Sequence, residues 1–272
     1  MNYQQIDWKK YPTLKNLRDL STPPKNLYII GNFDPLIFEN CVSLVGSRRM
    51  TDYGSRVIEK IIPQLLSQKQ TIVSGFMYGV DQYAHQVCVE DGGKTIAVLG
   101  WGINTKLTGE DLKLAQKIIR TGGLLISEWK DQKAAHWTFP ARNRIVAALS
   151  SEVIIVEAAQ NSGSLITARF AQRLKRKLWA IPGPITSKTS YGTNNLIAQG
   201  LAKMWLPQSQ QTLPLTTDDP ILQALDQEAL TADEMARKLT IPVAEVGAAL
   251  SLLLISDQVL EKGGKYYIND AS

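Results

Sequence analysis

The amino-acid sequence predicts an α/β fold, in which a doubly wound and mainly parallel sheet is followed by a small C-terminal domain. Short apolar runs bounded by glycine alternate with stretches long enough for a helix, as in βαβ proteins. The runs are apolar at successive positions, which is typical of strands that helices cover on both faces. The length of 272 residues allows one large domain and one small module.

The elements of the large domain follow one another in regular order. Val57, Ile61 and Leu65 recur at helical spacing and predict the first long helix. The apolar runs predict strands at 27–31, 42–45, 71–73, 95–99, 124–126, 153–156 and 178–181. The stretches after them predict helices at 53–67, 80–90, 111–120, 142–149, 164–174 and 193–199. In such a sheet, ligands bind at the carboxyl ends of the strands, where the strand order reverses.

Prolines and composition predict the domain boundaries. Residues 1–25 are polar and end in a Thr-Pro-Pro breaker, so we expect a short N-terminal segment there. The sheet domain is expected at 26–206 and a linker rich in Gln, Thr and Pro at 207–217. The remaining residues, 218–272, form the predicted small domain.

This small domain is predicted to contain three helices and a hairpin. Asp219-Pro220 and Thr231 open the first two helices, and Pro242 starts the third. Gly263-Gly264 predicts the turn of a closing hairpin. Three helices followed by a hairpin are the pattern of a winged helix.

The charge is divided unequally along the chain. Residues 216–272 carry ten acids and four bases, a net charge of −6. Because the whole chain has a net charge of +5, the remaining residues carry a net charge of +11. A basic body favours a polyanionic partner, because neutralising phosphates releases condensed counterions. Charge alone leaves nucleic acid as one possibility beside an ordinary solvated basic face.

Several classes of protein are disfavoured by what the sequence lacks. Cys41 and Cys88 are isolated, and His85 and His136 are far apart, so we expect no metal site and no cofactor. The first residues have no apolar signal region, and no stretch approaches the roughly 20 apolar residues of a membrane span. We therefore expect a cytoplasmic protein that does not bind a membrane.

Polar, glycine-rich loops follow the predicted strands. Gly46-Ser47-Arg48 enters a helix, where backbone amides and a guanidinium suit a phosphate. Phe139 stands close to Arg142 and Arg144, as in sites where a ring stacks on a base and cations meet phosphates. Each loop alone could be an ordinary turn between a strand and a helix. Together they predict an anion-binding crevice.

Two further loops belong to the same edge of the sheet. Ser162-Gly163-Ser164 precedes a helix and offers hydroxyls and amides to an anion. In the loop at 74–81 we interpret Asp81 as a helix cap. Our hypothesis is that Arg48, Arg142 and Arg144 clamp phosphates while the ring of Phe139 stacks on a base.

Five motif blocks follow one another along the large domain: VGSR at 45–48, TIAVLG at 95–100, FPxRNR at 139–144, SGSLITAR at 162–169 and GTN at 192–194. In this order, from about residue 11 to residue 205, the chain resembles the DprA/Smf DNA-processing family. The resemblance implies an extended Rossmann-like domain, with a winged helix at the C-terminus, that binds single-stranded DNA without catalysis. It also implies a homodimer that protects incoming DNA and loads the RecA recombinase during natural transformation.

The pocket residues implied by the motifs are Gly46, Ser47, Arg48, Phe139, Arg142, Asn143, Arg144, Ser162, Gly163, Ser164 and Thr167. The sequence departs from the family pattern at Tyr78, Trp101 and Lys106.

One alternative is an enzyme, a Rossmann-like nucleotide phosphoribohydrolase of the lysine-decarboxylase-like family. Those enzymes use a glutamate on the ribose, and Thr167 stands roughly where that glutamate would fall. Glu157 remains a candidate acid or base, although no second titratable partner is evident nearby.

A second alternative is a transcription factor that reads DNA through the winged helix. The balance of −6 in residues 216–272 disfavours it, because a helix in a groove lined by phosphates needs Lys and Arg.

Overall fold

The computed structural model describes residues 2–207, 219–256 and 258–269. The chain divides into two compact units, Met1–Pro207 and Gln208–Ser272. Of the predicted linker at 207–217, only Pro207 lies within the described residues.

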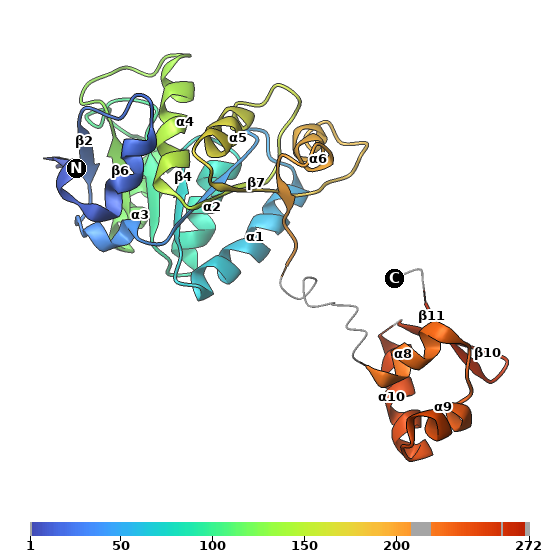
Figure 1. Cartoon of the computed structure of the whole chain (residues 1–272). Coiled ribbons are helices and arrows are strands. Elements are labelled where there is room, and N and C mark those ends of the chain that lie inside the picture. The colour runs from blue at the N-terminus through green and yellow to red at the C-terminus, as the bar shows by residue number, and fades with distance from the viewer. Residues whose placement is uncertain (1, 208–218, 257, 270–272) are drawn as a thin grey trace. The chain divides into compact units, whose positions relative to one another are not determined.

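Among the described residues of the first unit, nine strands form one sheet (Figure 1). The strands are β1 (Gln4–Ile6), β2 (Leu27–Ile30), β3 (Cys41–Val45), β4 (Thr71–Ser74), β5 (Thr95–Val98), β6 (Leu124–Ser127), β7 (Glu152–Ile155), β8 (Lys177–Ala180) and β9 (Lys203–Met204). Their order in the sheet is β1-β2-β6-β5-β4-β3-β7-β8-β9. From β6 to β9 all neighbours pair in parallel, whereas β2 pairs antiparallel to both β6 and β1. The α/β class and the mainly parallel sheet are as predicted.

The strand order reverses between β3 and β7. After β3 the chain adds β4, β5 and β6 on one side, and then returns to place β7, β8 and β9 on the other. The loops that leave β3 and β7 therefore diverge at this point and leave a crevice at the carboxyl edge of the sheet.

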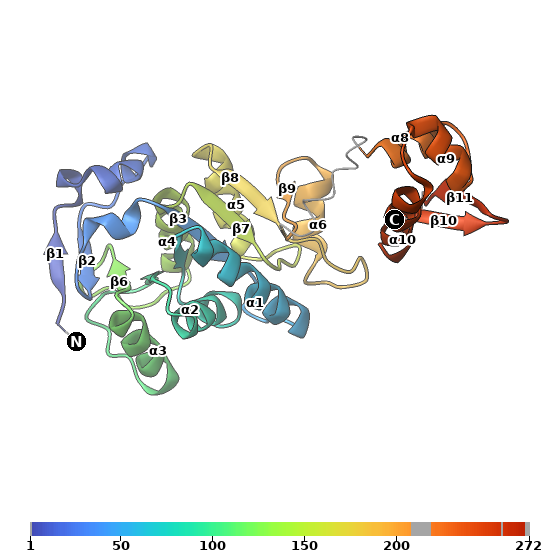
Figure 2. The ribbon, with the colours of Figure 1, turned by 90° about the horizontal axis from the view of Figure 1, so that it is seen from below.

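Helices cover both faces of the sheet. They are α1 (Asp52–Ser67), α2 (Val80–Glu90), α3 (Gly109–Arg120), α4 (Thr138–Leu149), α5 (Ser164–Arg173) and α6 (Tyr191–Ala198). Figure 2 shows α1, α2 and α3 along one face, and buried side chains of α4 and α5 pack with the opposite faces of β3 and β7. Burial on both sides explains why the strands read as uninterrupted apolar runs.

Residues 1–25, expected as a separate short segment, lie in the same compact unit as the sheet. They contain β1 and two 3₁₀ helices, η1 (Trp8–Lys10) and η2 (Pro12–Asp19), and a third, η3 (Pro35–Phe38), follows β2. Trp8, Leu14 and Leu17 are buried in the core beside the sheet, and the indole of Trp8 donates to the carbonyl of Pro24 at 2.9 Å. The breaker at residues 22–24 thus ends a packed segment.

The second unit has the predicted three helices and hairpin. These are α8 (Pro220–Gln227), α9 (Ala232–Leu239), α10 (Val243–Ile255), β10 (Val259–Lys262) and β11 (Lys265–Ile268). Thr231 and Glu234 form a capping box at the start of α9, and Met235, Val246 and Leu250 lie in a separate small core. Gly263 and Gly264 take left-handed φ values of 63° and 76° in the hairpin turn.

No single helix in the described ranges is long and apolar enough to cross a bilayer. Length and composition let α9 and α10 pass such a test only as a pair, and they meet at a bend of 118°.

Candidate nucleic-acid interface

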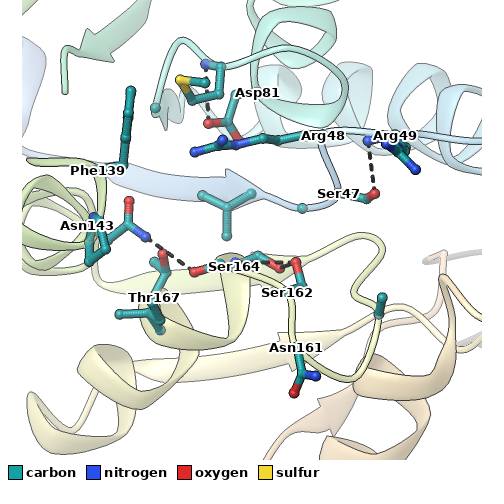
Figure 3. A pocket seen from close by; sticks show the side chains of 18 of the residues that line it. Ser47, Arg48, Arg49, Asp81, Phe139, Asn143, Asn161, Ser162, Ser164 and Thr167 are labelled. Atoms are coloured by element: carbon teal, nitrogen blue, oxygen red, sulfur yellow. Dashed lines mark hydrogen bonds between the residues drawn. The ribbon is translucent and has the colours of Figure 1, made fainter. Parts of the chain in front are cut away.

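A pocket of about 930 Å³ opens at the reversal point between β3 and β7. Its walls come from the loops after β3, β4, β7 and β8 and from the first turns of α4 and α5 (Figure 3). Ten of the eleven residues that the motifs implied line it, namely Gly46, Ser47, Arg48, Phe139, Arg142, Asn143, Ser162, Gly163, Ser164 and Thr167. The eleventh, Arg144, is not among the lining residues.

Glycines allow the loop after β3 to pack closely against the start of α2. A Cβ atom at Gly46 would lie 2.6 Å from Cγ2 of Val80, and one at Gly79 would lie 2.3 Å from the carbonyl oxygen of Ser47. Gly79 also has a left-handed φ of 76°. The amide of Val80 donates to the same Ser47 oxygen at 3.1 Å, which ties the two loops together. Larger residues would force the loops apart.

This turn leaves the side chain of Arg48 exposed at the pocket. The hydroxyl of Ser47 accepts a hydrogen bond from the amide of Arg49 at 3.0 Å and so stabilises the turn. Cζ of Arg48 lies 5.0 Å from the centre of the Phe139 ring, in a cation–π contact. The Phe139 ring is itself held edge-on by Trp101, with ring centres 6.3 Å apart. The guanidinium is therefore placed over the pocket by an aromatic support.

Helix α4 begins at Thr138, four residues before the predicted start at residue 142. The hydroxyl of Thr138 accepts from the amide of Ala135 at 3.1 Å, and Pro140 is tolerated because first-turn amides need no partner within the helix. Arg142 and Asn143 are therefore helical residues with fixed directions rather than parts of a mobile loop.

Arg142 is 2% exposed and does not present its charge as the predicted phosphate clamp requires. Its guanidinium donates hydrogen bonds to the backbone carbonyls of Gly75 and Val98, at the ends of two neighbouring strands. Burial lowers the pKa of this guanidinium to about 10, and the charge of Asp81 opposes that fall. The contacts make Arg142 an internal tie beneath the pocket.

Asp81 lies in the first turn of α2, whose N-cap is Gly79, so the predicted capping role is not observed. Its carboxylate is buried and accepts from the amide of Met77 at 3.4 Å. Burial raises the pKa of this carboxyl above its ordinary value, and the positive charge of Arg142 opposes the rise. Asp81 thus supplies a negative charge close to the buried arginine.

The opposite wall consists of the loop after β7 and the N-terminus of α5. The hydroxyls of Ser162 and Ser164 are 2.8 Å apart, and the amide group of Asn143 donates to the carbonyl of Gly163 at 3.3 Å. Thr167 lies one turn further along α5 and lines the same side. Arg48 faces this hydroxyl-rich helix start across the pocket, so a bound anion would meet positive potential from both walls (Figure 3).

Glu157 is buried beside this region but is not among the residues that line the pocket. Its carboxylate accepts from the amide and hydroxyl of Thr51, at 2.9 and 2.6 Å, and from the hydroxyl of Thr189 at 3.1 Å. These bonds anchor the start of α1 and leave the candidate acid or base of the enzyme hypothesis in a structural role.

Sequence inspection missed part of the lining. Arg49, Asn161, Lys188 and Tyr191 contribute to the pocket, as does His136 before α4. Lys188 lies on the loop between β8 and α6, and Tyr191 is the first residue of α6. Within the described ranges, no group of three or more His, Cys, Asp or Glu side chains could hold a metal ion.

His85 is a fully buried imidazole whose effect on stability can be measured. The hydroxyl of Thr95 donates to the carbonyl of Ile72, so Nδ1 of His85 donates to that hydroxyl oxygen at 2.7 Å. Nε2 is buried and has no hydrogen-bond partner among the described residues, and burial lowers the pKa of His85 to about 3. The unfolded chain binds a proton near pH 6.5, whereas the folded chain does not.

The contribution of His85 to the free energy of unfolding should therefore be fully present above pH 6.5 and should be lost as the pH decreases towards 3. Between pH 7 and pH 5 we expect His85 to lower the free energy of unfolding of the first unit by about 2 kcal/mol. Urea unfolding can be followed by tryptophan fluorescence, because all six tryptophans lie in this unit. The variant His85→Gln should lose this part of the pH dependence, whereas the exposed His136→Gln should keep it. If the free energy of unfolding depended on pH equally in both variants, His85 would not be the group responsible.

Comparisons with known proteins agree with the fold and the motifs. The family model of the DNA recombination-mediator protein A matches residues 2–214, and that of the DprA winged helix domain matches residues 207–265. Protein Smf of Synechocystis is 35% identical over 245 residues, which cover 88% of this chain and 61% of the relative. The DNA processing protein DprA of Streptococcus pneumoniae is 37% identical over 214 residues, covering 73% of this chain and 75% of that one. The chain thus spans about three fifths of the Synechocystis relative.

Two solved structures are also similar. The X-ray structure of DprA from S. pneumoniae superposes with a TM-score of 0.67 at 35% identity, over 78% of this chain and 74% of that chain. DprA from Helicobacter pylori, described for its single-stranded DNA binding mode, gives a TM-score of 0.68 at 31% identity, over 77% of this chain and 94% of that one.

Proposed function

Because the chain belongs to the DNA recombination-mediator protein A family, we propose that its pocket binds single-stranded DNA. The observation that carries the proposal is the meeting of an exposed Arg48 with the hydroxyl-rich start of α5 across one pocket. Both walls favour an anion. A relative that is described for binding single-stranded DNA supports the same ligand.

In this proposal a phosphate lies between the two walls. Arg48 donates to it from one side, helped by the backbone amides of the loop at Gly46, while the helix start at Gly163 and Ser164 faces it from the other. These contacts are blind to the base, so sequence preference should be slight. A base can stack beside the phosphate on the exposed part of Phe139, as we predicted from the sequence.

The resemblance and the family support a finer proposal. We propose that the chain protects incoming DNA and loads RecA in the cytosol, as a homodimer, during natural transformation or recombination. We also propose that it binds without catalysis. The phosphoribohydrolase alternative has less support, since both oxygens of Glu157 are engaged by Thr51 and Thr189.

The second unit is not proposed to read duplex DNA. Helix α10, the third helix of the winged helix and the one that would enter a groove, contains Glu245 as its single charged residue. A recognition helix without Lys or Arg gains little from the phosphates that border a groove.

The proposal can be tested by a salt titration of the full chain with single-stranded and duplex DNA of the same length, beside an assay for nucleotide hydrolysis. We expect tighter binding to the single strand, affinity that falls steeply with salt, and no turnover. Equal affinity for the duplex would contradict the stacking part of the proposal. Release of a nucleobase from a nucleotide would favour the enzyme.

Arg144 should affect stability and leave DNA binding unchanged, although the motif implied it as a site residue. Its guanidinium pairs with the carboxylate of Glu128 at 2.6 Å, with side-chain exposures of 13% and 10%, and also donates to the carbonyl of Thr22 at 3.1 Å. Arg144→Leu should lower the free energy of unfolding by about 2 kcal/mol, because Glu128 then stays nearly buried without its cation. Glu128→Gln, which keeps a hydrogen bond, should cost less. A tenfold loss of affinity in folded Arg144→Leu would return this residue to the interface.

A further inference from the structure

Three exposed aromatic rings surround the pocket. Tyr78, Trp137 and Tyr191 expose 64%, 57% and 53% of their surface, and they are the exposed aromatic residues among those described in the first unit. All three follow the carboxyl ends of parallel strands, namely β4, β6 and β8: Tyr78 and Trp137 lie on loops, and Tyr191 is the first residue of α6. The remaining aromatic side chains of that unit are buried or half-buried. Exposed rings are thus confined to the edge of the sheet that carries the pocket.

The placement of each ring relates it to the pocket wall. Tyr191 lines the pocket directly, and Trp137 and Tyr78 each adjoin a lining residue, His136 and Met77. Trp137 also packs against Trp129 in a T-shaped arrangement, with ring centres 5.7 Å apart at 84°. A ring that is held by such a contact and remains more than half exposed is a platform on which a base can stack.

Trp137 and Tyr191 flank the pocket. Trp137 precedes α4 and Tyr191 starts α6, and both views of the ribbon show α5 between these two helices (Figures 1 and 2). Helix α5, with its hydroxyl-rich start, therefore lies between the helix that follows Trp137 and the helix that Tyr191 begins. The exposed cations that line the pocket are Arg48, Arg49 and Lys188, and no described carboxylate forms an ion pair with them.

We infer that the strand-binding site is a track longer than the pocket, on which bases of single-stranded nucleic acid stack on Trp137 at one end and on Tyr191 at the other. The inference rests on the proposed function and extends it. Phosphates between the two stacked bases pass Arg48, Arg49 and Lys188, so the path combines rings and cations. That combination is the general design of sites that hold single strands without reading their sequence.

The track predicts that the effect of Trp137 depends on the length of the ligand. Oligothymidylates of about 4 and about 16 nucleotides span the range of site sizes known for single OB-fold domains that bind single strands. Trp137→Ala should weaken binding of the longer strand about tenfold, which is the effect of one lost stacked base, and change binding of the shorter strand much less. Trp137→Phe should retain most of the affinity, because a ring remains. Tyr191→Ala should weaken binding of the longer strand by a similar factor.

A matched control is Leu36→Ala. Leu36 is 61% exposed and lies in η3, which precedes β3 at the amino ends of the parallel strands. Its removal takes away apolar surface without touching the track, so affinity for both strands should stay within twofold of the parent chain.

The outcomes separate the inference from the proposed function. If the parent chain binds neither strand, the proposed function fails and the inference falls with it. If the parent binds both strands and Trp137→Ala binds both equally well, the function stands and the track is wrong. If Trp137→Ala instead changes the mass of the chain in solution by light scattering and leaves DNA affinity intact, the exposed rings belong to an interface between copies and the track is again wrong.

Discussion

Replacing Arg48 with alanine is expected to weaken the binding of single-stranded DNA by about ten- to a hundredfold at fixed salt. Arg48 is exposed, lies over the ring of Phe139 and points into the pocket from the loop after β3. The side chain makes no ion pair with a described residue, so the substitution removes a ligand contact; it also removes a positive charge that lowers the pKa of the buried Asp81. The measurement is fluorescence anisotropy of a labelled oligonucleotide at several salt concentrations.

The salt dependence gives a second, independent readout. Loss of one phosphate contact should reduce the slope of log affinity against log salt by about 0.7 for a single strand. Arg48→Lys keeps the charge but loses the planar fork and the stacked arrangement, so it should keep the slope and recover only part of the affinity.

Arg56→Ala provides the control for net charge. Arg56 is an exposed arginine of α1, the helix that follows the same loop, and it does not line the pocket. Its removal changes the charge of the chain by the same amount and should change affinity less than twofold. Equal losses in Arg48→Ala and Arg56→Ala would mean that a general field, and not a site at the pocket, holds the DNA.

The different fates of Arg48, Arg142 and Arg144 show which information a linear motif carries. Sequence position was enough to place all three near the reversal point of the sheet, since carboxyl ends of parallel strands share one edge. It was not enough to predict in which direction each side chain points. Residues two apart on a helix point roughly 200° away from each other, so Arg142 and Arg144 could serve one ligand only if they lay on a loop. The predicted helix at 142–149 already contained both residues, and on α4 one turns to the interior and the other to Glu128.

Burial and exposure were the other properties that the sequence left open. The apolar side chains of residues 1–25 are interspersed with charged ones and follow a 3₁₀ period, so the segment resembled a polar tail although Trp8 and Leu14 are buried. Conversely, Trp137 and Tyr191 have large aromatic side chains of the type expected in a core, but both are exposed. In both cases the neighbours that decide exposure come from distant parts of the chain, such as the sheet edge that covers Trp8.

Replacing Arg142 with methionine is expected to lower the free energy of unfolding of the first unit by about 3–5 kcal/mol. Methionine fills much of the same space but cannot donate to the carbonyls of Gly75 and Val98, which lose a buried partner. Asp81 would remain buried with its compensating charge removed, and its pKa would rise further. Urea unfolding followed by tryptophan fluorescence reports on this unit alone, since the second unit contains no tryptophan.

A double-mutant cycle with Asp81→Asn separates the charge from the hydrogen bonds. If the uncompensated carboxylate causes part of the loss, the double variant should be more stable than the sum of the two single variants predicts, by more than about 1 kcal/mol. Arg49→Met, an exposed arginine in the same pocket, should cost less than about 0.5 kcal/mol. A loss in Arg142→Met as small as that, together with a large drop in DNA affinity, would show that Arg142 turns outward to the ligand and that its buried position is not the one that functions. If Arg142→Met lost much stability and the effects of Arg142→Met and Asp81→Asn were additive, the charge of Asp81 would play no part in the loss. The hydrogen bonds to Gly75 and Val98 would then account for the whole contribution of Arg142 to stability.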